Sequence, residues 1–200
     1  VVSEMAKNKT GKKKIVVASI LAALAMQTAS VIDVAAAVGD QPSAAIANGS
    51  VTSGKTNGLA IGNFASSGSN QSIAIGYYSV ATATEADPAL PATAVGAGAN
   101  ATGQSTVALG LLAQATSGST TALGAKSVAS EDAAMAVGYG TKATGNYASA
   151  LGADATASNN DATAFGHGTV ASGGSSTALG SRAKAGGTAG VGIGMLANAT

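Results

Sequence analysis

Cysteine and tryptophan are absent from this sequence, aromatic residues make up 3% of it, and charged residues make up only 10%. The absence of cysteine fits an exported bacterial protein that does without disulfides. His167 is the only histidine, which excludes multi-histidine metal sites and leaves any histidine-dependent catalytic triad without support. We therefore predict that the chain is not an enzyme and holds neither a cofactor nor a metal ion.

Basic residues are also scarce beyond Ala37, where five lysines and arginines face seven aspartates and glutamates. Nucleic-acid binding depends on a basic patch, so we expect no nucleic-acid partner. Glu131 and Asp132 form an adjacent acidic pair at an expected turn, which is more typical of a solvated turn than of a metal site.

Residues 1–37 have the three parts of a signal peptide. Lysines between Lys7 and Lys14 form a positive region, Ile15 to Met26 is a 12-residue apolar run, and Ala35-Ala36-Ala37 offers a cleavage site. The run is shorter than the roughly 20 apolar residues that span a bilayer. The alternative is a retained membrane anchor, but Asp33 interrupts the apolar stretch where an anchor would continue.

One four-residue motif recurs ten times along residues 59–200: a small or apolar residue, alanine (replaced once by Gly192), a large apolar residue and glycine. Val107-Ala108-Leu109-Gly110 is a typical copy. The copies lie 14 residues apart, except for a gap of 20 between Gly76 and Gly96. Helical repeats need about 33 to 47 residues, whereas 14 fit one coil of two short strands and two turns. The sequence therefore predicts an all-β parallel solenoid of 14-residue coils.

The large apolar residue before each glycine is expected to point into the coil, because a strand alternates between two faces. Small residues three and five positions after the glycine, such as Ala113 and Ala115, are expected to face it. The predicted core ladder is Ile61, Ile75, Val95, Leu109, Leu123, Val137, Leu151, Phe165, Leu179 and Ile193.

The alanine of the motif is then expected on the outer face. A solvated face would tolerate larger polar residues, so an unbroken column of small side chains indicates close contact with another copy of the chain. A coil this thin also buries too little apolar surface to offset its ordering cost alone. The predicted contact residues are Ala74, Ala94, Ala108, Ala122, Ala136, Ala150, Ala164 and Ala178.

Two segments depart from the repeat. Residues 38–58 are a lead-in, in which Ala45-Ile46-Ala47-Asn48 is expected to form a degenerate first coil that caps the stack. Residues 82–92 carry the six extra residues and two prolines, which predicts a loop at a coil corner. Glu85, Asp87 and Leu90 are its candidate ligand contacts; the alternative is a tolerated insertion without a function.

Gln71-Ser72-Ile73-Ala74-Ile75-Gly76 and Ser105-Thr106-Val107-Ala108-Leu109-Gly110 resemble the head repeats of YadA-like trimeric autotransporter adhesins, and the resemblance covers residues 59–200. It implies a left-handed parallel β-roll and a homotrimer. It also implies a stalk that carries the head away from the outer membrane of a Gram-negative bacterium. The resemblance further implies, as an expectation, binding of collagen, fibronectin, laminin or like heads on other cells.

No heptads and no series of alternating C-terminal strands are present, so we expect the stalk and membrane anchor to lie outside this chain. Two alternatives to adhesion remain. One is a passive spacer without a ligand. The other is an ice-binding solenoid, but beside the hydroxyl column that includes Thr82 and Thr102 lies a mixed column that includes Val80 and Asn100.

Overall fold

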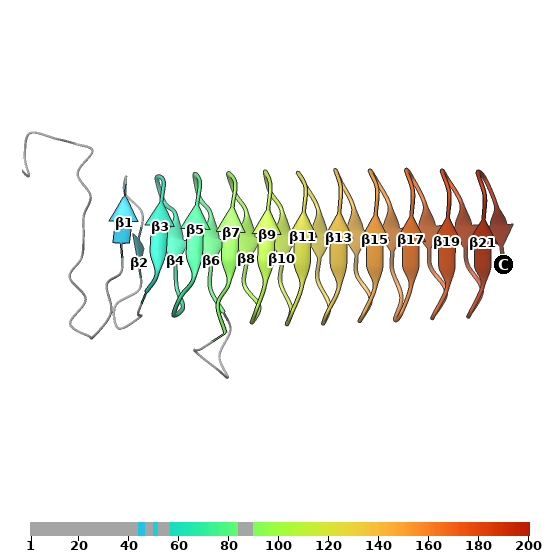
Figure 1. Cartoon of the computed structure of the whole chain (residues 1–200), viewed down its shortest axis with the longest axis horizontal. Helices are drawn as coiled ribbons and strands as arrows, with labels where there is room; N and C mark the ends of the chain where they lie inside the picture. Colours follow the sequence, from blue (N-terminus) through green and yellow to red (C-terminus); the bar gives the residue numbers. More distant parts are fainter. Residues whose placement is uncertain (1–43, 47–49, 52–56, 84–89) are drawn as a thin grey trace, which may run out of the picture. The chain divides into compact units, whose positions relative to one another are not determined.

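The computed structural model describes residues 44–46, 50–51, 57–83 and 90–200. In these ranges the chain forms two parallel sheets of eleven strands each, and successive strands alternate between the two sheets (Figure 1). No helix occurs within them. The predicted all-β parallel solenoid of 14-residue coils is confirmed, whereas the predicted signal peptide lies outside the described residues.

The odd-numbered strands form the first sheet and the even-numbered strands the second. The first sheet contains β1 Ala44–Ile46, β3 Leu59–Ile61, β5 Ile73–Ile75, β7 Thr93–Val95, β9 Val107–Leu109, β11 Thr121–Leu123, β13 Met135–Val137, β15 Ser149–Leu151, β17 Thr163–Phe165, β19 Thr177–Leu179 and β21 Val191–Ile193. The second contains β2 Ser50–Val51, β4 Ser66–Ser67, β6 Val80–Ala81, β8 Asn100–Ala101, β10 Gln114–Ala115, β12 Val128–Ala129, β14 Lys142–Ala143, β16 Thr156–Ala157, β18 Val170–Ala171, β20 Lys184–Ala185 and β22 Asn198–Ala199.

Equivalent residues of successive coils lie opposite one another in both sheets. Ala122 of β11, for example, pairs with Ala108 of β9 on one side and with Ala136 of β13 on the other. The ladder also crosses the insertion unbroken, because Ile73 pairs with Thr93 and Val80 pairs with Asn100. The extra residues therefore leave the stacking of the coils intact.

The lead-in contributes one coil, but its register differs from the predicted one. Ala44 pairs with Leu59 and Ile46 pairs with Ile61, so β1 and β3 are 15 residues apart rather than 14. Ile46 therefore continues the column of Ile61, where the predicted register had placed Ala47.

Each coil turns at two corners. The glycine corner follows an odd-numbered strand and begins with the motif glycine, whose φ lies between 116° and 137° at every copy. The polar corner precedes an odd-numbered strand, as at residues 103–106 and 117–120. Backbone bonds between coils continue through both corners, as from the Lys126 amide to the Leu111 carbonyl at 2.8 Å. The motif needs glycine because other residues rarely adopt that φ.

The interior consists entirely of small side chains, which overturns the predicted orientation of the motif. The motif alanines from Ala60 to Ala178 are buried, together with small residues such as Ala113 and Ala115 on the opposite strand. No fully buried side chain in the described part of the chain is larger than threonine. Two strands this close leave no space for leucine between them, so the alternation was predicted correctly but with the wrong face inward.

The predicted core ladder therefore lies on the outer face of the first sheet. Leu123 is 40% exposed and Phe165 48% exposed. The correction applies to all ten residues: Ile61, Ile75, Val95, Leu109, Leu123, Val137, Leu151, Phe165, Leu179 and Ile193. Likewise, the alanines predicted to contact another chain are covered by their own coil: Ala74, Ala94, Ala108, Ala122, Ala136, Ala150, Ala164 and Ala178.

Buried hydroxyl groups satisfy the carbonyls of the polar corner. Thr106 Oγ1 donates to the Gly103 carbonyl at 2.8 Å, and Thr120 Oγ1 donates to the Ser117 carbonyl at 2.9 Å. Ser176 repeats the bond to Gly173 at 2.7 Å. A buried hydroxyl is costly unless it is bonded, and each of these three hydroxyls donates a hydrogen bond to a corner carbonyl.

Candidate binding surfaces

The first surface is the aliphatic face, formed by the first and third residues of each odd-numbered strand from β3 to β21. The third residue is large and apolar in every strand, and the first varies from Leu59 and Met135 to Ser149 and Thr163. Because successive strands are in register, these side chains form two continuous columns. A contiguous exposed apolar stripe of this kind is typical of a protein interface.

The second surface is the edge formed by the glycine corners. Phe64, Tyr77 and Tyr78 gather at its first two turns, where Phe64 stacks on Tyr78 with ring centroids 4.7 Å apart. Tyr77 meets Tyr78 edge to face at 4.5 Å. Further along, Lys126 Nζ lies 3.4 Å from the Tyr139 hydroxyl and 5.6 Å from the centroid of its ring. This edge combines aromatic and charged side chains.

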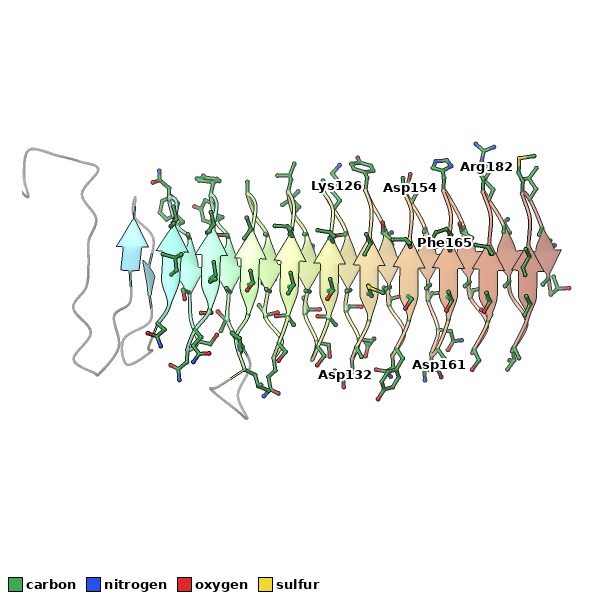
Figure 2. The ribbon with its side chains drawn as sticks, in the orientation of Figure 1. Lys126, Asp132, Asp154, Asp161, Phe165 and Arg182 are labelled. Carbon is green, nitrogen blue, oxygen red and sulfur yellow. The ribbon has the colours of Figure 1, made fainter. Side chains whose placement is uncertain are left out.

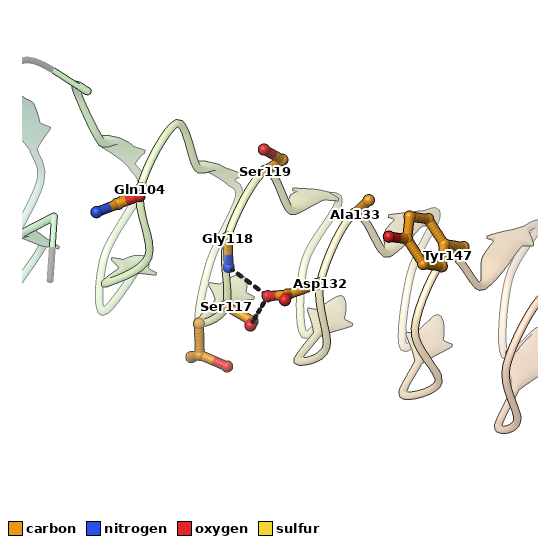
Figure 3. Close-up of a pocket in the computed structure, with 8 residues that line it drawn as sticks. Gln104, Ser117, Gly118, Ser119, Asp132, Ala133 and Tyr147 are labelled. Carbon is orange, nitrogen blue, oxygen red and sulfur yellow. Dashed lines mark hydrogen bonds between the residues drawn. The ribbon is translucent and has the colours of Figure 1, made fainter. Parts of the chain in front are cut away.

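The third surface is the edge formed by the polar corners, where an open groove of about 600 Å³ crosses successive turns. Its walls include Gln104, Ser119, Asp132 and Tyr147. Asp132 Oδ1 accepts hydrogen bonds from the Ser117 hydroxyl and, at 3.1 Å, from the Gly118 amide of the preceding coil (Figure 3). The carboxylate thus joins two neighbouring corners and is held in one orientation.

Charges divide between the two edges. Lys126, Asp154 and Arg182 project from the edge of the glycine corners, and Asp132 and Asp161 project from the opposite edge (Figure 2). No lysine or arginine lies at the described polar corners. Lys142 and Lys184 belong to strands β14 and β20 of the second sheet, so the acidic residues of this edge have no basic neighbour on it. The polar-corner edge is therefore acidic, and it would repel an anionic ligand.

The predicted ligand loop is only partly described. Glu85 and Asp87 lie outside the described residues, and Leu90 is 36% exposed. No cluster of three or more histidine, aspartate or glutamate side chains in the described ranges could hold a metal ion. In the same ranges, no helix is long and apolar enough to cross a membrane.

Sequence reasoning missed the aliphatic face and the groove. The face was detectable because every inward column holds only small residues, whereas the first residue of the odd-numbered strands varies in size. The groove joins side chains such as Ser117 and Asp132, which are 15 residues apart and meet only after the corners have their conformation. Single-residue patterns contain no signal for it.

Comparison with known proteins identifies relatives of the repeat. A family model described as YadA head domain repeat (2 copies) matches residues 53–79, 91–113, 115–141, 143–169 and 171–197, which together exceed half of the chain. The chain is similar to the crystal structure of the collagen-binding domain of the Yersinia adhesin YadA, with 28% sequence identity and a TM-score of 0.52. That match covers 70% of this chain and 67% of the other. The search of curated protein sequences found no match to this chain.

Proposed function

The chain belongs to the family of YadA head domain repeats, and from this premise we propose that it is the head of an adhesin on the surface of a Gram-negative bacterium. Its role is attachment to extracellular matrix proteins or to like heads on other cells. The similar Yersinia domain binds collagen, so collagen is the first ligand to test, followed by fibronectin and laminin. Export through the predicted signal peptide is part of the same proposal.

The observation that carries the proposal is the repetition of one outer surface along two in-register ladders. A stack of nearly equivalent coils offers many weak and similar sites along two continuous sheets. Multivalent contact can raise avidity by about 10² to 10⁴ over a single site, which suits attachment to a fibrous matrix.

Self-association is the second part of the proposal. The interior contains only small side chains, while the aliphatic face leaves leucine, isoleucine and phenylalanine outside. Burial of these side chains would stabilise each chain by about 25 cal/mol per Å² of apolar area. We infer that copies of the chain associate through this face, and the resemblance to trimeric adhesins gives their number as three.

Retention of coated beads tests adhesion. Beads that carry the folded head are passed over collagen, fibronectin, laminin and a surface bearing the same head. A variant with Glu85, Asp87 and Leu90 replaced by serine tests the insertion loop. The matched control replaces Glu131, Asp154 and Leu111 by serine, which removes the same residue types elsewhere.

Retention of the parent head on one of these surfaces supports adhesion. A loss confined to the loop variant assigns the contact to the insertion. If the parent head is retained on none of the four surfaces, the passive spacer is the better explanation of the fold.

A further inference from the structure

Tyr147 is an anomaly of the polar-corner edge. It is 66% exposed, and its φ of 58° is a left-handed value that recurs at the equivalent position of the neighbouring coils. The equivalent positions of the two preceding coils and the following coil hold Ser119, Ala133 and Asp161. The aromatic side chain, and not the backbone conformation, sets Tyr147 apart, and a ring this exposed adds nothing to the core of the coil. An exposed aromatic side chain with a polar hydroxyl is typical of a contact outside the chain.

The ring of Tyr147 lies at one end of the groove. Ala133 is its neighbour in the preceding coil, and Figure 3 shows the tyrosine hydroxyl on the Ala133 side. The small alanine side chain leaves space next to the ring. Beyond Ala133, Asp132 and Ser119 supply a carboxylate and a hydroxyl, so an aromatic ring and polar groups line the same groove.

Asp132 is oriented for a further hydrogen bond. Both of its bonds, from the Ser117 hydroxyl and the Gly118 amide, end on Oδ1. Its Oδ2 accepts no hydrogen bond from the described residues. A carboxylate oxygen has more than one acceptor site, so Asp132 is able to accept a hydrogen bond from a ligand hydroxyl without giving up its structural bonds.

We propose that this groove is a binding site for a neutral carbohydrate. A pyranose ring has an apolar C–H face, which stacks on an aromatic ring, and a rim of hydroxyls, which bond to carboxylate and hydroxyl groups. Tyr147 would supply the stacking surface, and Asp132 and Ser119 the polar contacts. The acidic residues of this edge disfavour sialylated or sulfated sugars.

The site goes beyond the proposed adhesion to matrix proteins, because it stands on the residues of the groove and requires no protein ligand. It also belongs to a different part of the coil from the aliphatic face. Self-association through that face therefore does not require burial of the polar-corner edge.

Saturation-transfer NMR on the full chain tests the proposal. The probes are methyl β-galactoside, methyl α-mannoside and N,N′-diacetylchitobiose, with sialyllactose as the acidic comparison. Saturation is expected on the ring C–H protons of at least one neutral probe and to be weaker on the sialic acid. Tyr147→Ala is expected to weaken binding about tenfold or more, as loss of a central aromatic contact does.

Matched variants separate stacking from structure. Tyr147→Phe keeps the ring and is expected to retain binding, and Asp132→Asn is expected to weaken it. Tyr139→Ala removes another exposed tyrosine, 54% exposed, from the glycine-corner edge of the same region and is expected to leave sugar binding unchanged. Circular dichroism of each variant verifies the fold.

Three results would overturn the carbohydrate site. The first is an absence of saturation for every neutral probe. The second is an equal saturation-transfer signal from the parent and from Tyr147→Ala. The third is saturation of an unglycosylated peptide but of no sugar. Retention on deglycosylated collagen reports on the adhesion proposal alone, so the two proposals fail independently.

Discussion

A methyl group on Gly110 would stand 2.6 Å from the carbonyl oxygen of Gly124. The φ of Gly110 is 137°, so an alanine there would be strained even without that neighbour. Both constraints act on the motif glycine wherever another coil follows, and together they set how closely the coils stack.

Gly110→Ala is therefore expected to destabilise the solenoid by at least about 1 to 3 kcal/mol, the usual cost of a backbone conformation that the residue does not favour. Gly174→Ala is the control, because Gly174 has no positive φ and no atom within 4 Å of the added methyl group. Thermal unfolding at one protein concentration measures both. Equal melting curves for the two variants would refute the stacking constraint.

Ala122→Leu tests the small-residue core. The variant is expected to cost on the order of 1 to 3 kcal/mol or more, since the space between the two sheets holds nothing larger than threonine. Thr121→Leu enlarges the neighbouring residue, which points outward, and is expected to leave the unfolding temperature of the chain nearly unchanged. Tolerance of leucine at position 122 would show that the interior is wider than described.

The fold was predictable because a 14-residue period fixes the length of a coil and leaves space for only short strands and tight turns. Which of the two alternating faces lies inward was not predictable from this period. Ala122 and Leu123 are adjacent and face opposite ways, and a period of two does not state which face is inward. The usual rule that large apolar residues are buried fails here, because the coil is too thin for them.

The positions of the side chains at the corners could not be predicted from the sequence either. Phe64, Tyr78 and Tyr147 have positive φ, although glycine or asparagine is the usual choice for such turns. Their clustering follows from the conformation of the corners and from the distance between coils. A sequence pattern contains neither the conformation of the corners nor the distance between coils.

Asp132→Ala is expected to loosen the polar corner of the preceding coil. The substitution removes the acceptor for the Ser117 hydroxyl and the Gly118 amide, so the Gly118 amide is expected to exchange faster with solvent. Glu131→Ala removes the same charge from the adjacent position, where the carboxylate makes no hydrogen bond with the described residues. Hydrogen exchange measures both; equal protection of Gly118 would contradict the role of Asp132 as a link between corners.

Leu123→Lys with Leu151→Lys tests association through the aliphatic face. Both side chains point outward, so each coil is expected to keep its fold, whereas two charges buried in an apolar contact without partners would dissociate the assembly. Gln114→Lys with Thr156→Lys is the matched control. It adds the same charges to the outer column of the second sheet, which already carries Lys142 and Lys184.

Light scattering at micromolar concentration gives the mass of each variant, and circular dichroism verifies its fold. A trimer for the parent and the control with a folded monomer for the leucine variant would support the aliphatic contact. Dissociation of both double variants would instead indicate a general effect of charge. A monomeric parent would refute self-association at that concentration, and with it the explanation for why leucine and phenylalanine lie on the outside of the coil.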